Sequence, residues 1–249
     1  MYFNICASGS KGNATLIGNN DTLILIDMGV SLTTLKDGLN EIDKDLTDID
    51  ALFITHEHSD HVKGMKFLSF CPKYALKDTL SENYLPLEKW NSIYVGTFKI
   101  TPIRTSHDAT NPCGYLIEDE DESLVYITDT GFIPDETIKY VYNPTYLIIE
   151  SNHDISMLIK SSRPMILKSR IMSNVGHLCN EDSALYASAI IGPRTKELVL
   201  AHLSEECNTE EQALKAYKAV FKKVRMGFGD IKIRCAKQYS TLLGGAYEI

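Results

Sequence analysis

Hydrophobic positions along the chain occur in short runs bounded by polar and turn residues, a pattern typical of buried β-strands. Residues 2–7, 13–18 and 22–27 predict an opening set of strands, with a turn at 18–21 between the second and the third. Later apolar runs predict strands at 51–56, 98–104, 115–118, 124–129, 146–151 and 197–202.

Helical periodicity separates these strands into two groups. Ser31 is a predicted N-cap for a helix whose apolar face carries Leu32, Leu35, Leu39 and Ile42. A second helical region begins near Val62, and the pair Thr209 and Gln212 predicts a capping box for an amphipathic helix over 210–224. We therefore expect an α/β (α+β) fold of two mixed β-sheets flanked by helices, in a single domain over 1–249.

The composition is that of a chain that folds around its own core. With 249 residues and 44% hydrophobic content, it can bury a packed interior without a partner. It has no basic leader, and no apolar stretch near the roughly 18 residues of a membrane helix. Its six cysteines are scattered without a Cys-x-x-Cys pair, which argues against disulfides. We expect a cytoplasmic protein with no membrane contact.

The charge is unevenly distributed. A net charge of −8 argues against a protein that coats nucleic acid through general attraction to phosphate. Residues 160–170, however, contain no acidic residue and carry Lys160, Arg163, Lys168 and Arg170. This segment predicts a local basic surface on an acidic protein.

Several predicted strands end at or near a residue that can bind a metal. These residues are Asp27, His56, His107, Asp129 and His202. Imidazole and carboxylate groups are ligands for divalent metals, and strand ends on one side of a sheet converge in space. The pattern therefore predicts a metal centre at the edge of a sheet.

The segment 56–61 reads His-Glu-His-Ser-Asp-His and adds further ligands from one loop. In the predicted centre His56, His58 and His107 bind one ion, Asp60, His61 and His202 bind a second, and Asp129 bridges both. Two divalent ions, Zn or Mn, about 3.5 to 4 Å apart can hold a shared hydroxide and clamp the oxygens of a displacement. We therefore predict metal-assisted hydrolysis, and we expect Glu57, between two ligands, to face solvent.

Further motifs lie outside this ligand set. They are SGSKGNATLI at 8–17, SHDATNPCGY at 106–115, TDTG at 128–131, ESNHD at 150–154, GHLCNEDSA at 176–184 and LAHLSEECN at 200–208. Together with the ligand set they resemble, nearly end to end, the metallo-β-lactamase superfamily and within it the WalJ/YycJ/VicX family. The resemblance implies an αββα metallo-β-lactamase sandwich and a 5′-to-3′ exonuclease on double-stranded DNA in mismatch repair. Cys179 and Cys207 depart from the family pattern.

Residues near these motifs are candidate substrate contacts, namely Ser10, Asn13, Asn152, His153, Lys168 and Arg170. The glycine-containing turn at 8–13 can bring backbone N–H groups to an anion, although a plain hairpin turn is the commoner outcome. The basic segment can bind the DNA backbone. His177 can donate a proton to the departing 3′ oxygen, and with Asp60 and Asp129 it completes the predicted catalytic set.

Other functions fit the same metal site. A hydrolase of a lactone, thioester or β-lactam needs the same ions, because fold and metal do not determine substrate. A nuclease directed at RNA is a further alternative. A non-catalytic regulatory protein is disfavoured, since it predicts damaged ligands and all seven are present.

Overall fold

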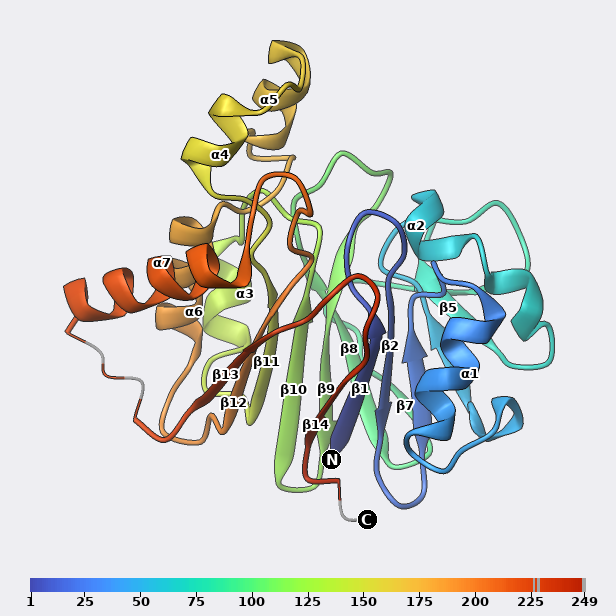
Figure 1. The fold of residues 1–249 in the computed structure, drawn as a ribbon. Coiled ribbons are helices and arrows are strands. Elements are labelled where there is room, and N and C mark those ends of the chain that lie inside the picture. The colour runs from blue at the N-terminus through green and yellow to red at the C-terminus, as the bar shows by residue number, and fades with distance from the viewer. Residues whose placement is uncertain (226, 228, 248–249) are drawn as a thin grey trace. The chain divides into compact units, whose positions relative to one another are not determined.

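The computed structural model describes residues 1–225, 227 and 229–247, which form two compact units (Figure 1). Unit 1 comprises Met1–Ile103, Ala109–Ser123 and the described part of Ala236–Ile249. Unit 2 comprises Arg104–Asp108 and the described part of Leu124–Cys235. The single domain over 1–249 stays a prediction.

The first sheet lies in unit 1. Its strands are β1 (Tyr2–Ala7), β2 (Ala14–Gly18), β3 (Leu23–Ile26), β4 (Ala51–Phe53), β5 (Lys73–Leu76), β6 (Leu85–Leu87) and β14 (Leu242–Gly245). Their order is β14-β1-β2-β3-β4-β5-β6, antiparallel from β14 to β3 and parallel from β3 to β6. Every residue of β1 to β4 is buried, which explains why these strands read as continuous apolar runs.

The second sheet has the order β13-β12-β11-β10-β9-β8-β7. Its strands are β7 (Ile93–Val95), β8 (Phe98–Arg104), β9 (Cys113–Asp119), β10 (Glu122–Ile127), β11 (Tyr146–Glu150), β12 (Glu197–Ala201) and β13 (Lys232–Cys235). Strands β10 to β13 run parallel, whereas β7 and β8 form an antiparallel pair. The carboxyl ends of β10, β11 and β12 therefore lie at the same edge of the sheet.

The helices of unit 1 are α1 (Leu32–Asn40), α2 (Ser59–Val62) and the 3-10 turns Leu46–Asp48 and Met65–Leu68. The Ser31 hydroxyl accepts a hydrogen bond from the Thr34 backbone N–H at 3.1 Å, which caps α1. Leu35 and Leu39 of α1 pack into the apolar core of unit 1. The predicted cap is confirmed, and so are Leu35 and Leu39 of the predicted apolar face. Leu32 is half-buried, and Ile42 is buried but lies beyond the end of the helix at Asn40.

The helices of unit 2 are α3 (Asp135–Tyr140), α4 (Ile155–Lys160), α5 (Met165–Ile171), α6 (Asn180–Ile190) and α7 (Glu210–Lys223). Helix α6 packs against both β11 and α7. Thr209 caps α7 by accepting the Gln212 N–H at 3.1 Å, which is one half of the predicted capping box. The other half is not formed, because the Thr209 backbone N–H donates to Asn208 Oδ1 at 2.9 Å. Among the described residues, no helix has the length and apolar character needed to cross a bilayer.

The predicted fold of two mixed β-sheets flanked by helices is confirmed. The sequence patterns missed the short strands β5, β6, β7, β13 and β14, and they missed the helices α3, α4 and α5. The helical region expected near Val62 instead begins at Ser59. The missed strands have three or four residues and include exposed or half-buried positions, whereas β3 and β4 are as short but wholly buried and read as apolar runs. The missed helices are too short to show two full turns of periodicity.

Candidate metal centre

Asp27, Asp129 and His202 turn the chain at strand ends through left-handed backbone conformations. Their φ angles are 59°, 51° and 55°. This region costs L-residues roughly 1–2 kcal/mol and is occupied mainly where the surrounding structure enforces it, often at functional sites. The backbone therefore fixes the direction in which each of these side chains leaves its strand.

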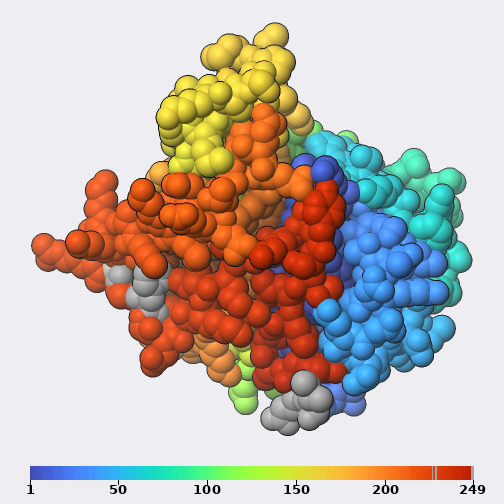
Figure 2. Space-filling model, viewed as in Figure 1, coloured from blue at the N-terminus to red at the C-terminus, as the bar shows by residue number. Residues whose placement is uncertain are grey.

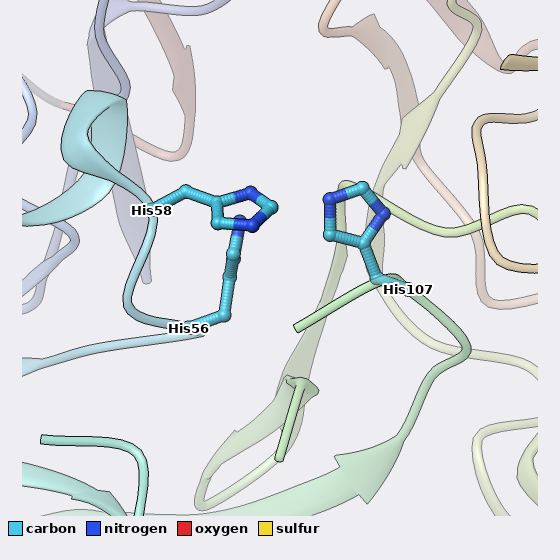
Figure 3. A group of neighbouring side chains, drawn as sticks. All are labelled: His56, His58 and His107. Atoms are coloured by element: carbon cyan, nitrogen blue, oxygen red, sulfur yellow. The ribbon is translucent and has the colours of Figure 1, made fainter. Parts of the chain in front are cut away.

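The histidine loop, residues 56–61 of unit 1, begins just after β4 and ends in α2, with His58 as the N-cap residue of that helix. His56 and His61 are buried and His58 is half-buried. The ring centroids of His56 and His58 lie 4.6 Å apart, and those of His56 and His61 lie 4.0 Å apart. Figure 3 shows His56 and His58 extending from this loop with their rings next to each other. The structure thus brings three of the predicted ligands of unit 1 together.

Asp27 orients His61. Its carboxylate lies 2.7 Å from His61 Nδ1 and accepts the backbone N–H of Thr55 at 2.9 Å. Burial raises the pKa of Asp27, while His61 and Thr55 act in the opposite direction. A carboxylate on Nδ1 places the ring proton there and makes Nε2 the acceptor atom of the ring, the atom that would bind a metal. Asp27, one of the strand-end candidates, therefore has a positioning role here.

The turn at 8–13 supports the backbone of the histidine loop. The Asn13 N–H donates to the carbonyl oxygen of Asp60 at 2.8 Å, and Asn13 Nδ2 lies 3.1 Å from His61 Nε2. A Cβ at Gly29 would lie 1.5 Å from the same Asp60 oxygen, so only glycine fits there. Asn13 is buried and Ser10 is exposed. Their contact with a substrate phosphate stays a prediction.

Glu57 is half-buried rather than open to solvent as expected. Its Oε1 atom accepts hydrogen bonds from the backbone N–H and the hydroxyl of Thr110, both at 2.8 Å. Burial acts to raise the pKa of Glu57, but these hydrogen bonds outweigh it and lower the pKa. Glu57 therefore ties the histidine loop to residue 110, which also lies in unit 1.

Unit 2 contains its own cluster of ligand-type residues. Asp129, Glu150, His177 and His202 each offer one atom, and these atoms all lie within 4.8 Å of one another. Two of these residues were predicted ligands and His177 was the predicted proton donor, whereas Glu150 was not predicted at all. The cluster occupies the edge of the sheet formed by the carboxyl ends of β10, β11 and β12.

Glu150 is the centre of this cluster. Its Oε1 atom lies 2.7 Å from His177 Nδ1 and 2.8 Å from His202 Nδ1, and its Oε2 atom accepts the backbone N–H groups of Thr130 and Leu178. Burial alone would raise the pKa of Glu150, but the two histidines outweigh it and lower the pKa to about 2. Glu150 is therefore an ionised group that orients two imidazoles.

His107 is held at unit 2 by a backbone acceptor. Its Nδ1 atom lies 3.0 Å from the carbonyl oxygen of Gly176, and its Nε2 atom lies 3.3 Å from Asp108 Oδ1. Burial is the main reason that the pKa of His107 is lowered. Figure 3 shows the ring on the loop that follows β8.

The hydrogen bonds at these imidazoles fit a site for divalent metal ions. His61, His107 and His202 each have Nδ1 within 3.0 Å of a carboxylate or carbonyl oxygen. This arrangement fixes the tautomer in which Nδ1 carries the proton and Nε2 is the ligand atom. The donor set of imidazoles and carboxylates suits borderline metals such as zinc and manganese.

The remaining predicted substrate contacts of unit 2 are largely internal. Asn152 is buried and donates from Nδ2 to the carbonyl oxygen of His202 at 2.9 Å. His153 is buried, and burial lowers its pKa to about 4. Lys168 is only 7% exposed, and its Nζ donates to the carbonyl oxygens of Ile159 and Ser161 at 2.7 and 2.8 Å. These contacts give Lys168 a structural role.

Arg170 is exposed, and its side chain forms an ion pair with Asp108, which neighbours His107. Asp108 is also the main reason that the pKa of Arg170 is raised. The predicted DNA contacts of Lys168 and Arg170 stay predictions.

The two cysteines that depart from the family pattern have structural roles. Cys179 is the N-cap residue of α6, and its sulfur accepts the Asp182 N–H at 3.4 Å. Cys207 is buried in a small apolar cluster with Leu158 and Ile171. Burial raises the pKa of the Cys179 thiol to about 12, so that it is not the thiolate a metal prefers.

The chain belongs to the β-lactamase superfamily, because residues 22–203 match the family model described as the β-lactamase superfamily domain. The metallo-β-lactamase fold protein YhfI from Bacillus subtilis matches the structure with a TM-score of 0.71 over 98% of this chain and 100% of that one. At 19% identity, YhfI shows the shared fold alone.

Two curated relatives are more similar in sequence. The chain is 32% identical over 244 residues to the exodeoxyribonuclease YycJ of Bacillus anthracis, and the match covers 92% of each protein. It is 37% identical over 227 residues to the exodeoxyribonuclease WalJ of Streptococcus pneumoniae, and the match covers 85% of this chain and 84% of that one. The resemblance drawn from the sequence motifs is confirmed.

Proposed function

We propose that the protein is a metal-dependent phosphodiesterase, a 5′-to-3′ exonuclease that degrades double-stranded DNA. The observation that carries the proposal is the set of imidazoles whose Nδ1 atoms are held by oxygen acceptors, so that Nε2 is presented as a ligand. The curated relatives named exodeoxyribonuclease supply the substrate class.

The proposed centre binds two divalent ions, zinc or manganese, through the ligands predicted from the sequence. These are His56, His58 and His107 for one ion, Asp60, His61 and His202 for the other, and Asp129 for both. Such ions activate water and polarise a phosphate when they are bound. The residues of the chain orient the ligands: Asp27 holds His61, and Glu150 holds His202.

His177 is the proposed proton donor to the departing 3′ oxygen. Its Nδ1 atom is held by Glu150 at 2.7 Å, so the ring presents Nε2 to a substrate. Asp60 and Asp129 complete the proposed catalytic set as ligands. Ser10, Asn13, Asn152, His153, Lys168 and Arg170 remain the proposed substrate contacts. Ser10 and Arg170 are the exposed ones among them, and Arg170 is paired with Asp108. We further propose a cytoplasmic role in DNA repair.

The proposal is tested with a duplex that carries a 5′ phosphate and a label at either end. Purified protein is supplied with manganese or zinc in turn, beside Asp129→Ala and a control variant, Asp135→Ala, at an exposed acid of α3. We expect progressive loss from the 5′ end with the wild type and with Asp135→Ala, and none with Asp129→Ala.

Two outcomes would contradict the proposal. Cleavage of matched RNA but not of DNA would make the protein a nuclease directed at RNA. No cleavage of either, despite bound metal, would favour a small-molecule ester, thioester or lactone.

A further inference from the structure

Helices α4 and α5 form a hairpin whose outer side is apolar. Figures 1 and 2 show this hairpin projecting beyond α6 and α7 of the same unit. At its tip, Met165 is 70% exposed and Ile166 is 87% exposed, and on α4 Ile159 is 58% exposed. Large apolar side chains at this exposure are unfavourable in water unless a partner covers them.

The outer apolar side is not needed to fold the hairpin. The inner side already packs Leu158 of α4 and Ile171 of α5 around Cys207, with Leu167 against them. A helix that packs against its own protein needs one apolar stripe, and here a second faces solvent. The outer side chains therefore indicate a contact with another molecule.

The charge of the hairpin favours an anionic partner. Residues 155–175 contain no aspartate or glutamate in a chain of net charge −8. Of their cations, Lys160 and Arg170 are exposed and Arg163 is half-buried, Arg163 and Arg170 keep ion pairs with Glu206 and Asp108, and Lys168 is buried. A symmetric contact with a second copy would bring these cations against themselves. A nucleic acid satisfies both the positive charge and the apolar surface, because apolar side chains insert between stacked bases while cations meet phosphates.

The hairpin is held in a fixed position. Lys168 Nζ donates to the carbonyl oxygens of Ile159 and Ser161, which joins α5 to the end of α4. Arg163 forms an ion pair with Glu206 at 2.9 Å. These contacts explain the buried lysine and join the hairpin to Glu206 of the same unit.

The base of the hairpin is continuous with the candidate site. Asp154, which directly follows His153, caps α4 by accepting the Met157 N–H at 2.8 Å. At the other end the His177 N–H donates to the carbonyl oxygen of Ile171 at 2.9 Å. The segment that begins four residues after Glu150 therefore returns to His177, the second partner of the same carboxylate.

We propose that Met165 and Ile166 act as a wedge that opens the end of a DNA duplex, so that only one strand enters the metal centre. The inference rests on the proposed nuclease function and adds how a duplex is made accessible to it. Unstacking a base step costs a few kcal/mol, which apolar side chains inserted into the stack offset.

The test compares two substrates that differ only at the end. One is a blunt duplex with a 5′ phosphate, and the other has the same sequence with its terminal nucleotides left unpaired. The variant Met165→Ser/Ile166→Ser is compared with Met165→Leu/Ile166→Leu, which keeps the apolar volume. A control, Leu185→Ser, removes an exposed apolar side chain from α6.

We expect the serine variant to degrade the blunt duplex about tenfold more slowly, the change that a loss of about 1.4 kcal/mol produces, and to degrade the unpaired substrate at the wild-type rate. The leucine and Leu185→Ser variants should match the wild type on both. Equal rates on the blunt duplex, or an equal loss on both substrates, would overturn the wedge. So would a change of oligomeric state in the serine variant, because it would assign the surface to a second copy. Failure of the wild type on both substrates would instead contradict the nuclease function itself.

Discussion

Each unit uses one buried carboxylate to orient imidazole rings, but the number of rings that the carboxylate contacts differs between the two units. In unit 1 the buried Asp27 holds the single imidazole of His61. In unit 2 the buried Glu150 holds His177 and His202 together. Burial determines the direction of the pKa shift of Asp27, which is raised, whereas the two histidines determine that of Glu150, which is lowered to about 2.

The comparison shows that burial alone does not decide the ionisation of a site carboxylate. Both carboxylates are fully enclosed, so the cost of desolvation is present in each. In unit 2 the two imidazoles outweigh this cost, whereas in unit 1 His61 and Thr55 do not. In unit 2 one carboxylate therefore orients two imidazoles, and the Gly176 carbonyl oxygen holds His107. In unit 1 the positioning is divided among Asp27, Asn13 and the backbone at Gly29.

The largest expected effect is loss of one ligand from either unit. His56→Ala in unit 1 and Asp129→Ala in unit 2 should each lower the rate of DNA cleavage about a thousandfold or more, since both remove an ion that activates water. Rates on an end-labelled duplex measure this, with bound metal counted in parallel. Full activity of His56→Ala would remove unit 1 from the proposed centre.

The second-largest effect is expected for Asp27 and Glu150, the carboxylates that orient the histidines. Asp27→Asn and Glu150→Gln are each expected to weaken metal binding by about 10- to 100-fold, with Glu150→Gln the more severe because two imidazoles, not one, then face a neutral amide in place of a carboxylate. Competition with a chromophoric chelator gives the affinities, and circular dichroism controls for folding. An equal or larger loss of metal affinity in Asp27→Asn than in Glu150→Gln would contradict the expected difference between the two units.

A third test compares one lysine in each unit. Lys168→Met leaves two carbonyl oxygens without their donor, so we expect a loss of about 2 kcal/mol in the free energy of unfolding. Lys63→Met, on the surface of unit 1, should change that free energy by less than about 0.5 kcal/mol. Denaturant titration measures both. A steep change in the salt dependence of DNA binding for Lys168→Met, without loss of stability, would instead support its phosphate contact.

The smallest effect concerns the left-handed strand ends. Asp129→Gly should be about 1 kcal/mol more stable than Asp129→Ala, because glycine adopts a φ of 51° without strain. Asp27→Gly against Asp27→Ala should show the same sign in unit 1, where φ is 59°. Thermal unfolding of the four variants measures these differences in stability. An alanine variant that is more stable than the matching glycine variant would contradict the backbone strain at that position.

The sequence predicts those features that depend on local pattern. Apolar runs that end in Asp27, Asp129 or His202 are visible because strand and ligand are adjacent in the chain. The role of Glu150 was missed because its partners, His177 and His202, lie 27 and 52 residues away. The burial of Lys168 was missed for a different reason, because charge predicts exposure unless the fold supplies acceptors, here the carbonyl oxygens of Ile159 and Ser161. Ligand residues next to their strands could be predicted from the sequence, whereas hydrogen bonds between residues far apart in the chain could not.

The contacts of Asn13 and Gly29 with the carbonyl oxygen of Asp60 have a consequence for metal loading. They are made by backbone and buried amide groups of unit 1, so the loop loses its conformational entropy when the chain folds. An arriving ion then meets ligands that are already ordered and does not have to offset that entropy itself. We expect the metal-free protein to stay folded and to reload quickly after treatment with a chelator.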